Sequence, residues 1–216
     1  MDISYLGHSS FRIKTKDVVI VTDPYDPQMV GLKFPKIEAD IITVSHDHKD
    51  HNNTPLVAGA RMVVNSPGEY EIQGVSIIGF DSYHDDKKGS VRGSNTMFLI
   101  ECEGVKLLHM GDLGHLPDKK IFESMGDIDV LMIPVGGTYT IGSKEASEIV
   151  KELEPSFILP MHYKVPGLKE ETFGTLQSVD DFLKECGYDT ENLDKLSFKK
   201  ELIDPEVTKV IVLNKK

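Results

Sequence analysis

Residues 45–51 read Ser45-His46-Asp47-His48-Lys49-Asp50-His51. They follow the apolar run at residues 39–44, whose pattern predicts a short buried strand. These imidazoles and carboxylates therefore lie just beyond the end of a strand. Open α/β sheets usually have their active sites at such strand ends. Both groups are suitable ligands for zinc and similar divalent ions. In extended backbone His46 and His48 point to one side and can share an ion, while Asp50 and His51 can turn toward a second. The alternative is a surface loop that is merely rich in histidine.

The composition describes an acidic, folded chain. Its 216 residues are 39% hydrophobic, which predicts one domain over residues 1–216 with a sizeable core. The formal net charge of −11 argues against nucleic acid and anionic membrane surfaces as partners. The N-terminus lacks the pattern of a signal peptide and no apolar run approaches the ~18 residues of a membrane span, so we expect a cytoplasmic protein. Cys102 and Cys186 lack metal-ligand spacing and are expected to be reduced thiols.

The order of the predicted elements indicates the fold class. Strand patterns dominate the first half, and strands then alternate with helices. Strands are expected at residues 3–6, 11–14, 18–21, 41–44, 62–64, 71–80 (a hairpin), 96–101, 105–109, 128–133, 157–159 and 207–213, and helices at residues 54–60, 117–125, from Ser143 and from Ser178. This order favours an α/β fold of four layers, with two packed sheets and helices outside them.

Ligand-type side chains follow five of these strands. The groups are Asp23, the residues of the 46–51 stretch, His84, Asp112 and His162. The spacing suggests a first ion held by His46, His48 and His84, a second held by Asp50, His51 and His162, and Asp112 as a bridge between them. Two ions about 3.5–4 Å apart would share a hydroxide formed from water whose pKa falls toward about 7. A site with a single ion remains open.

Three further polar residues are candidates for supporting roles. Asp23 can accept a hydrogen bond from a ligand imidazole and fix its tautomer, or it can cap the turn before Pro24. His109 points to the opposite strand face from Asp112, so we rank it below His84 as third ligand of the first ion. His8 lies in a turn and can donate a proton, contact substrate or only stabilise the turn. Together with Asp50 it is the candidate for proton transfer.

The motif His46-x-His48-x-Asp50-His51, with the later ligands in order, resembles the metallo-β-lactamase superfamily of metal-dependent hydrolases. Shorter segments resemble its branch of uncharacterised hydrolases similar to L-ascorbate-6-phosphate lactonase, among them Tyr5-Leu6-Gly7-His8-Ser9, Thr22-Asp23-Pro24 and residues 109–114, 134–140 and 158–163. The resemblance covers roughly residues 1–163. It implies an αββα sandwich of two mixed β-sheets flanked by helices, with the site at one edge between the sheets.

The resemblance also narrows the chemistry. Flavodiiron oxidoreductases of this superfamily have a glutamate where His48 stands, which disfavours iron redox chemistry. The RNA-processing members carry an insertion that binds nucleic acid, for which this chain has little room. One departure concerns His84, which lies in Ser82-Tyr83-His84-Asp85 rather than in a Gly-His-Thr context, so His109 stays open as an alternative ligand.

We therefore expect an enzyme, a hydrolase in which a metal-bound hydroxide attacks an ester, lactone, amide or phosphodiester of a small molecule. The cofactors would be two divalent ions, zinc first, with manganese or iron as alternatives because nitrogen and oxygen ligands do not select among them. One rival is a non-catalytic metal-binding or sensing module on the same fold, marked by a closed cleft. The other is an iron oxidoreductase. The sequence does not indicate the oligomeric state.

Loop residues near the ligands are candidates for the substrate pocket. They are Asn65, Arg92, Asn95, Tyr139, Thr140 and Tyr163. Arg92, with Lys87 and Lys88, could recognise a phosphate or carboxylate in this acidic protein. A solvated charged loop is the simpler interpretation of those three cations.

Overall fold

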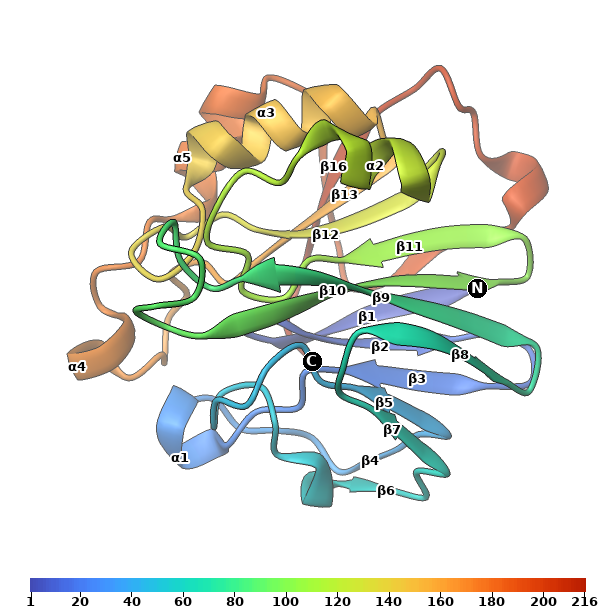
Figure 1. The fold of residues 1–216 in the computed structure, drawn as a ribbon, viewed down its shortest axis with the longest axis horizontal. Coiled ribbons are helices and arrows are strands. Elements are labelled where there is room, and N and C mark those ends of the chain that lie inside the picture. The colour runs from blue at the N-terminus through green and yellow to red at the C-terminus, as the bar shows by residue number, and fades with distance from the viewer.

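Two mixed β-sheets pack face to face at the centre of the computed structural model, which describes residues 1–216 (Figure 1). The first has the strand order β15 (Leu196–Ser197), β1 (Asp2–Gly7), β2 (Ser10–Lys14), β3 (Val19–Thr22), β5 (Ile41–Thr43), β7 (Met62–Val64). The second has the order β14 (Thr190–Leu193), β16 (Lys209–Leu213), β13 (Phe157–Met161), β12 (Val130–Pro134), β11 (Val105–His109), β10 (Ser94–Cys102), β9 (Val75–Tyr83), β8 (Gly68–Ile72).

The outer layers differ in thickness. The helices α2 (Lys119–Met125), α3 (Ser143–Leu153) and α5 (Val179–Cys186) cover the outer face of the eight-stranded sheet (Figure 1). The six-stranded sheet is covered only by short elements, namely α1 (Pro27–Val30), the 3₁₀ helix η1 (Thr54–Leu56) and a two-stranded sheet of β4 (Ile37–Glu38) and β6 (Val57–Ala58). The remaining elements are α4 (Glu170–Phe173) and the 3₁₀ helix η2 (Lys200–Leu202). The predicted α/β class, two mixed sheets flanked by helices, is confirmed.

Strand alternation builds separate cores on the two faces of each sheet. In β3, Ile20 is buried between the two sheets, whereas Val21 packs beneath the outer layer. In β11, Leu107 faces the other sheet and Leu108 faces the helices. Burial of such side chains supplies roughly 1.5–3 kcal/mol each, which fixes the register of the strands that carry the site.

Most predicted elements occur, and the differences have local causes. The predicted helix at residues 54–60 is wrong: one 3₁₀ turn is followed by β6, which pairs with β4 and buries Val57 in the outer core, and Gly59 with φ +80° leaves the helical conformation. The helix predicted from Ser143 is capped by Gly142. The helix predicted from Ser178 is confirmed. Ser178 is its N-cap, and the Ser178 backbone N–H donates to Asp181. The short elements β14, β15, α1 and α4 carry no periodic pattern and were not predicted.

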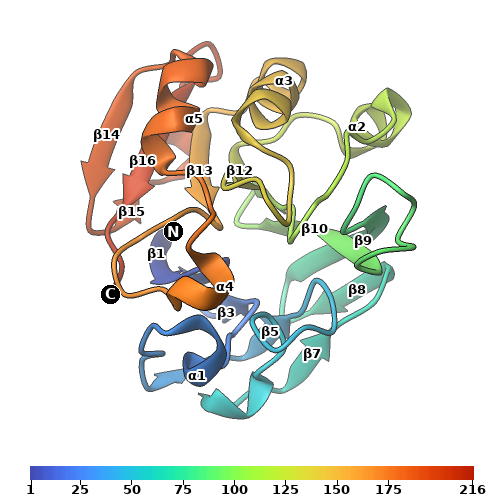
Figure 2. The ribbon, with the colours of Figure 1, turned by 90° about the vertical axis from the view of Figure 1, so that its left-hand side faces the viewer.

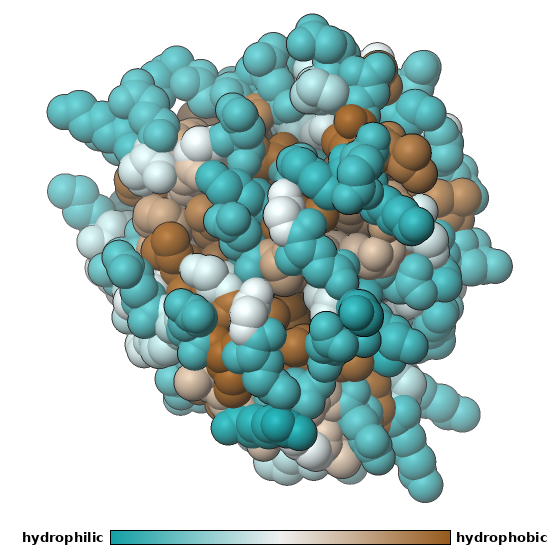
Figure 3. All heavy atoms as spheres, turned by 90° about the vertical axis from the view of Figure 1, so that its right-hand side faces the viewer, coloured by the Kyte–Doolittle hydropathy of each residue, from teal (hydrophilic) through white to brown (hydrophobic).

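One edge of the sandwich collects the ends of the strands that lead into the polar motifs. The strands β11, β12 and β13 are parallel, as are β3 and β5, so their carboxyl ends lie together. Figure 2 shows this edge, with α1, α4 and the loop after β9 around it. The opposite end of the molecule is mostly hydrophilic with scattered apolar patches (Figure 3). None of the helices combines the length and apolar character needed to cross a bilayer.

Candidate metal centre

Two groups of potential ligands lie side by side at this edge. The ligand atoms of His46, His48 and His84 lie within 4.8 Å of one another. Those of Asp50, His51, His162 and His8 form a second group of the same tightness. The structure thus brings together both predicted ligand sets, and it adds His8 to the second.

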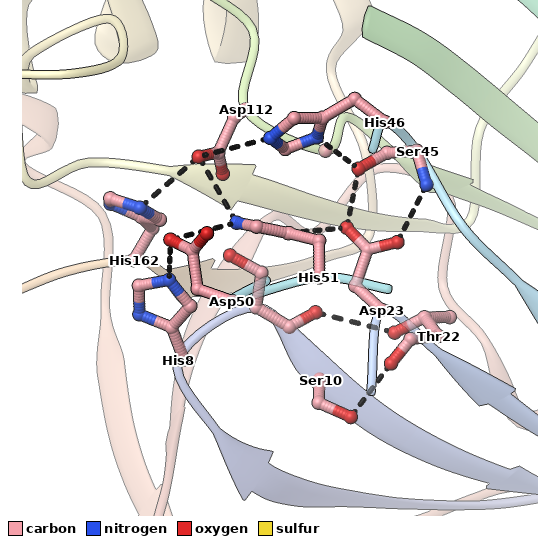
Figure 4. A network of polar contacts seen from close by, with 12 residues as sticks. His8, Ser10, Thr22, Asp23, Ser45, His46, Asp50, His51, Asp112 and His162 are labelled. Carbon is pink, nitrogen blue, oxygen red and sulfur yellow. Dashed lines mark hydrogen bonds and ion pairs between the residues drawn. The ribbon is translucent and has the colours of Figure 1, made fainter. Parts of the chain in front are cut away.

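Asp112 lies between the two groups. Its Oδ2 atom is 3.1 Å from His51 Nε2, 3.2 Å from His162 Nε2, 3.3 Å from His84 Nε2 and 3.9 Å from His46 Nε2. One carboxylate oxygen therefore faces imidazoles of both sets, as a bridging ligand would (Figure 4). This convergence joins segments that follow β5, β9, β11 and β13.

The cluster holds buried polar atoms that form no hydrogen bond of normal geometry within the protein, although some of the imidazole nitrogens face Asp112 Oδ2. They include Nε2 of His46 and His51, Nδ1 of His84, both ring nitrogens of His162 and Oδ1 of Asp112. Buried polar atoms in folded proteins almost always have a partner, so their concentration here calls for one. Nitrogen and carboxylate lone pairs suit divalent cations, and the residues present therefore fit metal ions.

The protonation states of the cluster suit metal ligands. Burial lowers the pKa of His46 to about 3 and also lowers the pKa of His84, so both imidazoles are neutral at pH 7. Burial opposes ionisation of Asp112, but the imidazoles of His162 and His51 hold the pKa of its carboxyl well below the usual range. Neutral imidazoles and an ionised carboxylate are the forms that bind metals.

His51 is the exception. Burial alone would lower its pKa, but the carboxylates of Asp112 and Asp50 raise it well above the ordinary value. Without a metal, this ring therefore carries a proton between two anions. A bound cation would take the place of that proton, since the same carboxylates attract either charge.

A network behind the ligands fixes their tautomers (Figure 4). The buried Asp23 carboxylate accepts hydrogen bonds from Ser45 N at 2.8 Å, from Ser45 Oγ at 2.6 Å and from His51 Nδ1 at 2.8 Å. Ser45 Oγ lies 2.9 Å from His46 Nδ1. Because the Ser45 hydroxyl proton goes to Asp23, His46 Nδ1–H donates to Ser45, and Nε2 of both histidines is left for the centre. Asp23 thus supports ligand histidines, and it does so partly through Ser45, which sequence reasoning missed.

Two residues predicted near the site support the turn that carries Asp112. His109 Nε2 donates to Ser9 O at 2.8 Å and its Nδ1 accepts from Gly111 N, so it lies outside both ligand groups while His84 lies within one. Asn95 Oδ1 accepts from Asp112 N at 2.9 Å, and its Nδ2 donates to a backbone carbonyl. Asn95 is therefore a buried support and not a pocket residue.

An open cavity of about 360 Å³ gives access to the cluster. Its walls are Met29, His48, Lys49, Asp50, His84, Arg92, Asp112, Tyr139, His162, Thr172 and Phe173. Of the remaining predicted pocket residues, Thr140 lines a neighbouring hollow, Asn65 is exposed elsewhere, and Tyr163 is buried in the core against Tyr5. Sequence reasoning missed four residues of the cavity wall. One is Lys49, although it lies inside the 45–51 stretch. The others are Met29, Thr172 and Phe173, which belong to four-residue helices that no sequence pattern indicates.

Comparisons with known proteins agree with this geometry. The family model described as the Beta-lactamase superfamily domain matches residues 2–162. The UPF0173 metal-dependent hydrolase of Thermococcus onnurineus is 29% identical over 191 residues, which cover 74% of this chain and 84% of the relative. A crystal structure from Thermotoga maritima, assigned as a Zn-dependent hydrolase of the metallo-beta-lactamase superfamily, is 38% identical with a TM-score of 0.80 and covers 100% of this chain and 99% of that one. CmlA, a diiron beta-hydroxylase from Streptomyces venezuelae, shares the fold at 14% identity and a TM-score of 0.66, over 98% of this chain and 52% of its own.

Proposed function

The chain belongs to the family of the Beta-lactamase superfamily domain, and from this premise we propose that it is a metal-dependent hydrolase. Its substrate would be a small molecule with an ester, lactone, amide or phosphodiester bond, and residues 1–216 would act as one hydrolase domain. The observation that carries the proposal is the position of Asp112 Oδ2, 3.1–3.9 Å from four imidazoles at a cavity that admits a substrate. The superfamily assignment is confirmed, and a specific similarity to the lactonase branch stays a prediction.

The ligand groups assign the residues that would hold two divalent ions, with zinc as the first choice. His46, His48 and His84 would hold one, Asp50, His51 and His162 the other, and Asp112 both. Ions bound there would lower the pKa of a water molecule toward about 7 and polarise the oxygen of the bond to be cleaved.

The protein's own groups then handle the proton. Asp50 lines the cavity, and its Oδ2 accepts a hydrogen bond from His8 Nε2 at 3.1 Å. Burial lowers the pKa of His8 to about 4, so His8 is neutral and cannot supply a proton from a charged ring at pH 7. We assign proton transfer to the Asp50 carboxylate, which His8 holds in place. The Phe173 ring lines the same cavity and packs edge-on against the His8 ring, with the ring centroids 5.0 Å apart.

The open cavity argues for turnover over the alternative of a sealed metal-sensing module. It reaches Asp112, the histidines His48 and His84 of one ligand group, and His162 of the other. A module that only binds a metal needs no space for a substrate at the ligand atoms. The space is in the range of small-molecule sites, which supports a compact substrate.

Metal analysis combined with substrate screening tests the proposal. The protein would be purified without added metal, analysed for its elements, chelated, and reloaded with zinc, manganese or ferrous iron. Each form would be assayed on esters, lactones, phosphodiesters and thioesters. We expect about two ions per chain and hydrolysis that is lost on chelation and returns on reloading. Tight metal binding without hydrolysis of any compound would favour the sensing module, and iron with visible absorption bands and oxygen consumption would favour an oxidoreductase.

A further inference from the structure

The loop at residues 84–93, called here the rim loop, has its shape fixed from inside by one carboxylate. Asp85 is buried, and its Oδ1 accepts the backbone N–H groups of Lys87 at 2.8 Å and Gly89 at 2.9 Å. Its Oδ2 accepts those of Val91 at 3.0 Å and Arg92 at 2.7 Å. Four backbone bonds to one side chain make the loop a preformed wall, and they place the backbone of Arg92 at its end.

The side chain of Arg92 lies at the boundary of the metal cavity. Its guanidinium carbon is 5.6 Å from the centre of the Tyr139 ring, and Nη2 donates to Thr138 O at 3.3 Å. Both Arg92 and Tyr139 line the metal cavity and also the neighbouring hollow of about 440 Å³. The stacked pair therefore forms the partition between the two spaces.

The guanidinium has no carboxylate partner, although the chain contains 35 acidic residues. None of the ion pairs of the protein includes Arg92, and its one side-chain hydrogen bond uses one of five N–H donors. An arginine with free forked donors on a cavity wall is suited to a carboxylate or phosphate.

The charges around Arg92 determine which of the two spaces an anion would enter. The neighbouring hollow is also lined by Asp86 and Glu145, which repel anions. The metal cavity is lined by a second cation, Lys49, and its two carboxylates belong to the ligand groups. An anionic group is therefore favoured on the metal side of the partition.

We propose that Arg92 determines substrate specificity by binding a carboxylate or phosphate that the substrate carries apart from the bond to be cleaved. Asp85 positions Arg92 through the rim loop, and the apolar body of the substrate packs against Phe173 and Tyr139. The substrate class is then a small, anionic ester, lactone or amide. This inference rests on the proposed function, because it places the reacting bond at the metal centre.

Matched ester substrates test the role of Arg92 in the zinc-loaded protein. Mono-para-nitrophenyl glutarate and para-nitrophenyl valerate differ only in a terminal carboxylate, and a phosphonate analogue of the glutarate separates phosphate from carboxylate recognition. In Arg92→Met we expect kcat/KM for the glutarate ester to fall at least about tenfold, mainly through KM, and for the valerate ester to stay within about twofold. Lys88→Met is the matched control, because it removes the same charge from an exposed position of the rim loop that lines neither space.

If neither ester is hydrolysed, the proposed function fails for esters, but the role of Arg92 can still be tested. Binding of analogues that cannot be cleaved provides that test. Gamma-benzoylbutyrate and valerophenone form the same matched pair as ketones, and calorimetry on the zinc-loaded protein measures their affinities. We expect Arg92→Met to weaken the carboxylate at least about tenfold and the neutral ketone by less than about twofold. Equal losses for both ligands, no change in either, no binding to the parent protein, or the same loss in Lys88→Met would overturn the assignment.

Discussion

The two ends of the β-sandwich treat buried polar groups in opposite ways. At the end away from the cavity, Asp129 accepts the backbone N–H of Lys106 and two hydrogen bonds from Lys200 Nζ, at 2.6 and 2.8 Å. At the cavity end lie all nine buried side-chain atoms that lack a partner, and seven of them belong to His8, His46, His51, His84, Asp112 and His162. An unsatisfied buried group costs roughly 1–3 kcal/mol, so a cation bound at the cavity end would stabilise the fold. The cavity end is therefore suited to binding a ligand, whereas the polar groups of the opposite end stabilise the fold.

The largest effect is expected from removing the carboxylate at the centre of the unsatisfied cluster. We expect Asp112→Ala to lose one of two bound ions per chain. Because the lost metal contribution is worth several kcal/mol, kcat/KM should fall by more than about 10³-fold. Elemental analysis and hydrolysis of the same substrate measure both effects. Full activity in this variant would reject Asp112 as the bridging ligand.

A second variant weakens the support behind the ligands. Asp23→Asn keeps the size of the side chain, but a single amide oxygen cannot accept the bonds now received from Ser45 and His51. We expect metal affinity to fall by about 10–100-fold, measured by competition with a chromogenic chelator.

Asp129→Asn at the opposite end is the matched control for that variant. It should lower the free energy of unfolding by about 1–2 kcal/mol, because a backbone N–H and Lys200 lose part of their acceptor. Metal affinity should stay within about twofold of the parent. If both variants lose affinity equally, the loss reflects general destabilisation, and the two ends are not functionally distinct.

The sequence predicts the ligand residues better than the cavity walls. The predicted ligands follow apolar strands directly, so strand order was enough to bring His84 and His162 to the residues of the 46–51 motif. The cavity walls were not predictable, because α1 and α4 are single turns without periodicity. Asn95 was placed on a loop because β10 extends beyond its apolar pattern, and the strand in fact buries this side chain beneath Asp112.

Asp85 offers the finest test, since it is a carboxylate at the cavity end that the protein itself satisfies. Burial opposes its ionisation, but the four backbone N–H donors, that of Arg92 first, lower its pKa to about 2 from an ordinary 3.8. A pKa that folding depresses stabilises the native state above the unfolded value, and this contribution fades as the pH falls from 3.8 toward 2. The measurement uses chelated protein, so that loss of metal at low pH does not contribute. The difference in unfolding free energy between parent and Asp85→Asn should therefore shrink between about pH 6 and about pH 3. Urea denaturation measures it, with Asp86→Asn as control, because that exposed carboxylate contacts only Lys87 Nζ. A gap that stays constant with pH, or one that Asp86→Asn reproduces, would show that Asp85 does not hold the rim loop through its charge.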